Sequence, residues 1–191
     1  MLFRHFALLA IACTPVAVLA QDAPPRHQLY GGYSFLSNSF NGVPGARHPL
    51  NGWDAGFAFP SWHNLRFRVD ISGYHGNNTG AEQHAIVFLG GAQYDWHFRH
   101  ETLFAEGLAG DAALNRYWGP NALPGVQASF ASVLGGGLDT RINRRFAWRI
   151  EGGYQYSNFA LVNSVPGLVP IPYSGLPRNF ARLSTGLVWN F

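Results

Sequence analysis

The chain has 191 residues, of which 47% are hydrophobic, 15% are aromatic and only 12% are charged. Ordinary soluble domains have about 25% charged residues, so this composition argues against that class. The net charge is only +3 and no basic stripe interleaves with stacking aromatics, so we predict no nucleic-acid partner.

The N-terminus has the pattern of a secretory signal peptide. Arg4 precedes an apolar run over residues 6–20, and small residues before Gln21 offer a cleavage site. The run is too short for a membrane helix, and no later stretch approaches the ~20 apolar residues that such a helix needs. We predict a signal peptide over residues 1–20 and a single domain over residues 21–191.

The single cysteine, Cys13, lies within this signal segment. Lipid attachment to Cys13 is the less favoured alternative, because the residues before it form a poor lipobox and the apolar run continues past it. A mature chain without cysteine fits an oxidising compartment without a disulfide framework.

The last twelve residues alternate between an apolar face and a small or polar face. The apolar face holds Ala181, Leu183, Thr185, Leu187, Trp189 and Phe191, and the opposite face holds Arg182, Ser184, Gly186, Val188 and Asn190. Alternation of this kind is typical of a β-strand with one apolar side.

The same alternation recurs in seven earlier segments, near residues 29–35, 50–59, 65–72, 84–98, 102–111, 129–142 and 146–157. Tight turns follow the second, fourth and sixth segments. Longer loops rich in Gly, Pro and Asn follow the others, near residues 37–49, 76–80, 112–127 and 158–179. This rhythm predicts an all-β fold, an eight-stranded antiparallel up-and-down β-barrel whose first and last strands pair.

Charged residues fall on the opposite face from nearly all large apolar residues of the predicted strands. In a soluble barrel such as a lipocalin, the apolar residues would point inward. The lumen of an eight-stranded barrel is too narrow to hold the aromatic side chains of this chain. An arginine that faces lipid at the membrane midplane destabilises a barrel by about 2–4 kcal/mol. We therefore predict a transmembrane barrel with a lumen charge network of Asp54, Arg66, Arg68, Asp70, Asp95, Glu106, Asp139, Arg141, Arg149, Glu151 and Arg182.

Aromatic residues near the strand ends predict interfacial girdles on the outside of the barrel. The girdle comprises Trp53, Phe59, Tyr94, Trp96, Trp148, Tyr154, Tyr156, Trp189 and Phe191.

Buried charges must be paired or hydrogen-bonded. In an eight-stranded barrel the third strand faces the seventh across the lumen. We therefore predict that Arg66 or Arg68 bonds to Glu151 or Glu106, which plugs the interior. Inward glycines would make room for the long guanidinium groups, namely Gly56, Gly91, Gly110, Gly153 and Gly186.

Two other patterns suggest a metal or a cofactor only superficially. His97 and His100 flank a tight turn and point differently, so we interpret them as interfacial polar residues. No helix follows Gly135-Gly136-Gly137, so the anion-binding geometry of a phosphate loop is missing. Close strand packing or barrel curvature explains these glycines better. We predict no metal site and no cofactor.

The sequence evidence for a catalytic site is equally weak. Glu106 with Asp139 or Asp70 has the residue types of a hydrolytic carboxylate pair, but the arginines among them favour a structural network. His84 and Ser132 are possible members of a nucleophilic arrangement, yet no motif links them. We predict no catalytic residues.

Several stretches together resemble small bacterial outer-membrane β-barrel proteins of the OmpA-like transmembrane class. They are the signal peptide, Tyr30-Gly31-Gly32-Tyr33, Ala105-Glu106-Gly107, the glycine-rich sixth segment and the ending Leu187-Val188-Trp189-Asn190-Phe191. The resemblance implies a bacterial outer-membrane barrel over residues 21–191, in contact with outer-membrane lipid. It also implies insertion by the barrel assembly machinery, which reads the C-terminal aromatic strand, and the chain ends without the peptidoglycan-binding domain of some relatives.

The expected function is that of a non-enzymatic outer-membrane barrel with a polar, plugged lumen and surface loops, serving envelope structure or surface interaction. The alternatives are a lipid-modifying outer-membrane enzyme and a narrow pore. A soluble lipocalin-like ligand carrier is the non-membrane alternative, and the partner of the loops is unknown.

Overall fold

The structure, a computed structural model, describes residues 27–37, 49–78, 81–117, 125–157, 161–163, 171–173 and 179–191. Its strands are β1 (Gln28–Leu36), β2 (Leu50–Trp62), β3 (Leu65–Asn78), β4 (Ala81–His97), β5 (Glu101–Tyr117), β6 (Gly125–Arg141), β7 (Phe146–Ser157), β8 (Leu161–Asn163), β9 (Ile171–Tyr173) and β10 (Asn179–Asn190). The predicted signal peptide, residues 1–20, lies outside the described residues.

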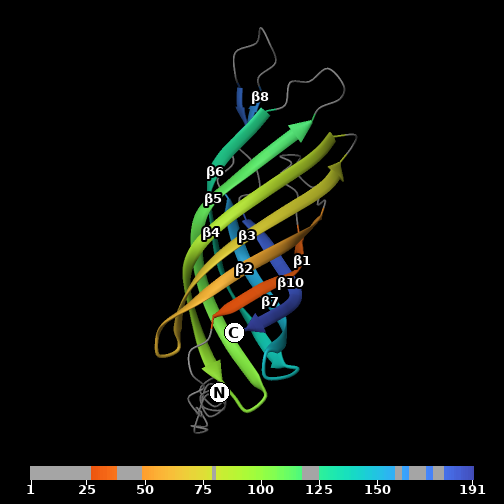
Figure 1. Ribbon diagram of the computed structural model, residues 1–191. Helices are drawn as coiled ribbons and strands as arrows, with labels where there is room; N and C mark the ends of the chain where they lie inside the picture. The colour runs from red at the N-terminus through yellow and green to blue at the C-terminus, as the bar shows by residue number, and fades with distance from the viewer. Residues whose placement is uncertain are drawn as a thin grey trace, which may run out of the picture.

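Eight of these strands close into a barrel in the order β1-β10-β7-β6-β5-β4-β3-β2 (Figure 1). Every neighbouring pair is antiparallel. The first and last strands close the barrel, with pairs running from Gln28↔Asn190 to Leu36↔Arg182. The predicted eight-stranded up-and-down β-barrel is therefore confirmed, and β8 pairs with β9 in a separate two-stranded sheet.

One end of the barrel carries the tight turns and the end of β10, and the β8–β9 hairpin lies at the other end (Figure 1). We call these the turn end and the loop end. The β8–β9 hairpin lies within residues 158–179, which we expected to be a loop throughout.

Several strands extend beyond their predicted limits at the loop end. The loop expected at residues 76–80 is mostly strand, since Gly76 pairs with Gln83 and Asn78 with Ala81. Polar side chains break the apolar alternation there, but the backbone groups still pair across β3 and β4. An apolar pattern marks where a strand faces lipid, whereas backbone pairing decides where the strand ends.

The tight turn predicted after the second segment begins later than expected, because β2 continues past residue 59 to Trp62. The pairing of β2 with β3 shifts register between Pro60 and Trp62, a bulge that accommodates a residue without a backbone N–H. The chain then reverses at His63-Asn64, where His63 adopts the left-handed conformation with φ 52°.

Side-chain polarity is inverted relative to a soluble barrel. On the outside, Phe67 is 50% exposed and Trp148 is 45% exposed, whereas Arg68 inside the lumen is 1% exposed. The large apolar side chains thus coat the exterior, and the charged ones line the interior. This arrangement confirms the predicted facing and fits a barrel whose outer wall contacts lipid.

The predicted girdle aromatics all lie on the outer face, and eight of the nine are exposed: Trp53, Phe59, Tyr94, Trp96, Trp148, Tyr154, Trp189 and Phe191. Tyr156 is half-buried. Rings contact one another at the turn end, with centroids 4.9 Å apart for Tyr94 and Trp96 and 4.7 Å apart for Trp189 and Phe191. Contact of these rings with lipid headgroups stays a prediction.

No helix occurs in the part of the chain that the structure describes, and therefore none long and apolar enough to cross a membrane.

The exterior makes a testable prediction at Ile150, an outward residue near the middle of β7. A transmembrane strand needs about 9–11 residues, so Ile150 lies near mid-membrane and Phe146, the first residue of β7, near the interface. We expect Ile150→Arg to lower the free energy of unfolding by about 2–4 kcal/mol, and Phe146→Arg to add a charge penalty of only about 0–1 kcal/mol. Denaturant titration in phospholipid vesicles measures both. Small and equal losses of unfolding free energy in the two variants would contradict a lipid-facing exterior.

Candidate functional site

At the centre of the lumen, the guanidinium of Arg68 binds three carboxylates. Its Nη1 donates to Glu106 Oε2 at 2.5 Å and to Glu151 Oε2 at 2.8 Å. Its Nη2 donates to Asp70 Oδ2 at 2.9 Å. Because Glu106 lies on β5 and Glu151 on β7, this one side chain reaches from β3 across the lumen to two other strands.

Arg182 of β10 extends the same network toward β2. Its Nη2 donates to Asp54 Oδ2 at 2.9 Å and to the two oxygens of Asp70 at 3.1 and 3.2 Å. The same nitrogen lies 3.8 Å from Glu151 Oε1. Asp70 and Glu151 therefore connect both arginines, and the six side chains join β2, β3, β5, β7 and β10. We call this set (Asp54, Arg68, Asp70, Glu106, Glu151 and Arg182) the central network.

A second ion pair lies between the central network and the turn end. Arg149 binds Asp139 in a two-pronged contact, with Nε–Oδ1 at 2.7 Å and Nη2–Oδ2 at 2.8 Å. Its guanidinium carbon lies 4.3 Å from the ring centroid of Phe104 and 5.2 Å from that of Tyr30. Planar stacking and paired N–H donors suit arginine to such a buried position.

A third pair lies nearer the turn end. Arg66 Nε donates to Asp95 Oδ2 at 2.5 Å, and Gln93 donates to Asp95 Oδ1 at 2.7 Å. The prediction allowed Arg66 or Arg68 to reach Glu106 or Glu151. Arg68 makes both contacts, and Arg66 binds its neighbour on β4 instead.

The structure brings ten of the eleven predicted lumen charges into the buried interior. Arg141 is the exception and corrects the sequence-based set. It is the last residue of β6 and is exposed at the turn end. Alternation assigns a residue to a face but gives no depth along the barrel, which is why Arg141 was grouped with the buried charges.

Only one of the five inward glycines makes room for a guanidinium as predicted. A Cβ on Gly56 would lie 3.2 Å from the Val69 carbonyl oxygen, 3.3 Å from Arg68 Nε and 3.5 Å from Asp70 Oδ2. For Gly91, Gly110 and Gly186, the three nearest atoms to such a Cβ are all backbone atoms of the adjacent strand, and for Gly153 the nearest atom belongs to the Val133 side chain. Close approach of neighbouring strands explains these four better.

Toward the loop end the lumen is apolar, which the sequence did not predict. One cluster of buried side chains fills this region: Leu36, Leu50, Tyr74, Ala85, Val87, Leu89, Leu108, Ala112, Ala131, Val133 and Phe180. By two-residue alternation, Val87 and Leu89 share a strand face with Asp95, and Leu108 shares one with Glu106, so the sequence places all three in the lumen. Their apolar character was the available signal for this loop-end cluster.

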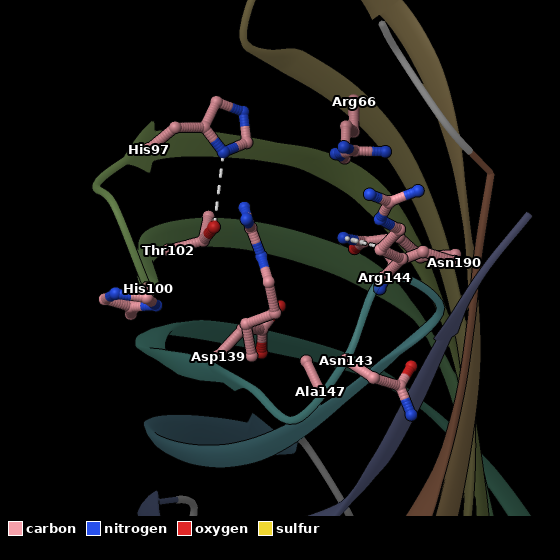
Figure 2. A pocket seen from close by; sticks show the side chains of 11 residues that line it. Arg66, His97, His100, Thr102, Asp139, Asn143, Arg144, Ala147 and Asn190 are labelled. Carbon is pink, nitrogen blue, oxygen red and sulfur yellow. Dashed lines mark hydrogen bonds between the residues drawn. The ribbon is translucent and has the colours of Figure 1, made fainter. Parts of the chain in front are cut away.

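The lumen opens into a cavity of about 370 Å³ at the turn end (Figure 2). Within it, His97 Nδ1 lies 3.2 Å from Thr102 Oγ1. Three arginines and one carboxylate, that of Asp139, are the charged groups that line the cavity. The lining comprises Gln28, Arg66, His97, His100, Thr102, Asp139, Arg141, Asn143, Arg144, Ala147 and Asn190.

The other candidate groups lie in the turn-end cavity or in the central network. Among the described residues, no group of three or more His, Cys, Asp or Glu side chains could hold a metal ion. His97 and His100 both line the turn-end cavity. Glu106 and Asp70 are bridged by Arg68, so their carboxyl groups belong to the central network.

His84 and Ser132 are far apart in the barrel. Ser132 pairs with Ala109, which in turn pairs with Gly90. Gly90 is six residues along β4 from His84, or about 20 Å at ~3.3 Å per residue. These two residues therefore form no hydrogen-bonded nucleophile and base.

Three solved structures of bacterial outer-membrane barrels share this architecture. Neisserial surface protein A matches with a TM-score of 0.60 and 13% identity over 87% of this chain and 96% of that chain. The attachment invasion locus protein Ail of Yersinia pestis matches with a TM-score of 0.59 and 11% identity over 88% of this chain and 100% of that one. The N-terminal β-barrel domain of Pseudomonas aeruginosa OprF matches with a TM-score of 0.51 and 15% identity, over 86% of this chain and 97% of that domain.

No known protein family and no curated protein matches the sequence. At such low identities the structural likeness establishes the fold, and it confirms the resemblance to small outer-membrane barrels at that level. Together with the apolar exterior, it supports the bacterial outer membrane as the location of the barrel.

The central network makes a prediction about stability. Arg68→Met removes the cation from Glu106 and Glu151, and leaving buried charges unpaired costs about 3–5 kcal/mol of unfolding free energy. Combining Arg68→Met with Glu106→Gln and Glu151→Gln removes the stranded charges, so most of this loss should be recovered. The control Arg99→Met, at an exposed turn position, should change stability by less than about 0.5 kcal/mol. If Arg68→Met unfolded at the same denaturant concentration as the wild type, the ion pairs assigned to Arg68 would be contradicted.

Proposed function

We propose that the protein is a non-enzymatic outer-membrane barrel whose lumen is closed by its own side chains and whose function resides at the cell surface or in envelope structure. The observation that carries this proposal is the central network. Arg68 of β3 and Arg182 of β10 bind carboxylates on β2, β3, β5 and β7, at distances of 2.5–3.1 Å for the close contacts. A solute passing this level would have to separate buried ion pairs, which are strongly unfavourable to break.

The loop-end cluster supports the same proposal as a second barrier in series. It contains large side chains that are almost wholly buried, such as Leu36, Leu50 and Phe180. Hydrophobic constrictions exclude water and ions even where a narrow passage exists. A closed lumen leaves the two ends and the outer wall for interaction with other molecules.

A surface role is supported by the loop end and by the structural neighbours. The β8–β9 hairpin stands beyond the barrel strands at that end (Figure 1). One neighbour is a surface protein by name and another is an attachment invasion locus protein, which was also crystallised with the heparin analogue sucrose octasulfate. We propose that this chain likewise presents its loops to external partners.

Outer-membrane lipid and the barrel assembly machinery are the further partners that we propose. The exposed apolar exterior supports contact with lipid acyl chains. Strand β10 supports recognition by the assembly machinery, because it closes the barrel with β1 and carries the exposed aromatic Trp189 on its outer face.

A closed lumen predicts no ion conductance. In planar bilayers we expect wild-type protein to stay at the baseline of protein-free membranes. The double variant Arg66→Ala, Arg68→Ala should also stay there, because the loop-end cluster still seals the lumen. A porin inserted into the same bilayers provides the positive control, and slower gel migration after boiling verifies folding. Steady channels in the wild type, or their appearance in the double variant, would favour a pore.

The absence of catalysis predicts unchanged membrane lipids. Mass spectra of lipid A from cells with and without the protein should be identical, since His84 and Ser132 lie too far apart to act together. A mass shift that depends on the protein would establish lipid modification instead.

A further inference from the structure

Two histidines face each other on the outer wall at the loop end. His75 of β3 and His84 of β4 are direct register partners, and both are exposed. Their ring centroids are 4.6 Å apart with an interplanar angle of 37°. Their Nδ1 atoms are only 3.3 Å apart, so the two nitrogen-bearing edges converge more closely than the ring centres.

We propose that His75 and His84 bind a divalent transition-metal ion of the zinc class through their Nδ1 atoms. Zinc binds histidine nitrogen at about 2.0–2.1 Å, and a tetrahedral angle then separates two such nitrogens by about 3.3–3.4 Å. The observed separation matches this spacing. As a hydrogen bond it is longer than the usual range of about 2.7–3.2 Å for N–H donors.

The position of the pair makes it accessible to ions from outside. Along β3 the outward residues run Leu65, Phe67, Val69 and Ile71 before His75, and on β4 Ile86 and Phe88 lie on the turn-end side of His84. The histidines therefore follow the apolar band at its loop-end border. Trp53 lies over Gly73 beside them, as interfacial aromatics do at the border of lipid and water.

The site has two protein ligands and open coordination positions. Asn51 is the β2 register partner of His75, and its side-chain oxygen accepts a hydrogen bond from Tyr33. The described residues supply no third His, Cys, Asp or Glu for this ion. Water or a ligand from an external molecule would complete the shell, as it does in zinc sites with an open position.

The test uses the full folded chain in detergent micelles with zinc or copper ions alone. Zinc titration calorimetry should show one ion per chain. Copper, which binds nitrogen ligands more tightly than zinc, should give an electron paramagnetic resonance spectrum with coupling to two nitrogens. His75→Ala and His84→Ala should each weaken zinc binding at least tenfold, since even outer partners of a metal ligand contribute about 10–100-fold.

The matched control removes two histidines at the opposite end. His97→Ala, His100→Ala should bind zinc as the wild type does. Binding within twofold of wild type after loss of His75 or His84, or its loss in the control, would overturn the proposal. If a variant fails to fold, carbethoxylation of the wild type decides. Zinc should protect His75 and His84 but not His97, and equal modification with and without zinc would overturn it.

Discussion

The barrel depends on burying Arg68 with its carboxylates. An unpaired guanidinium in the lumen would cost several kcal/mol, yet the same side chain turned outward would face lipid at a cost of about 2–4 kcal/mol. A register slip of one residue along β3 would turn Arg68 outward and Phe67 inward together. The ion pairs of the central network form only when β2, β3, β5, β7 and β10 are all in register. The charged interior and the apolar exterior therefore require the same strand register. The central network thus helps to specify the fold as well as filling the lumen.

Along its axis the lumen is divided by chemistry. Polar side chains that include three arginines and two histidines line the turn-end cavity, followed by Arg149 with Asp139 and then by the central network. The loop-end cluster completes the series with apolar side chains. Arginine suits the middle levels because its planar group binds two carboxylate oxygens and also stacks on aromatic rings, as Arg149 does on Phe104. The interior is therefore packed as a core, although its chemistry is polar.

Sequence periodicity predicted whether a side chain faces the lumen or the outside. It did not predict how far along the barrel axis a residue lies or which residue it faces on the neighbouring strand. The two-residue period assigned Arg68 and Glu151 to the lumen, and counting strands placed β3 opposite β7. The same reasoning could not show that Arg141 lies at the open end, or that Arg66 prefers Asp95. The pairing of His75 with His84 was equally invisible, because it needs the exact register of β3 with β4. The strand ends at residues 76–78 and 81–83 were missed because the sequence there is mostly polar, although its backbone pairs across β3 and β4.

The constraints that fix the barrel weaken at its loop-end border. Outward residues in the apolar band must tolerate acyl chains, and inward residues must complete the network or the loop-end cluster. His75 and His84 lie outward and beyond the band, where neither requirement selects a residue type. Many polar residues would satisfy the fold at these two positions. Two imidazoles in direct register, with nitrogens at a metal-binding separation, therefore point to a use at the surface rather than to a demand of folding.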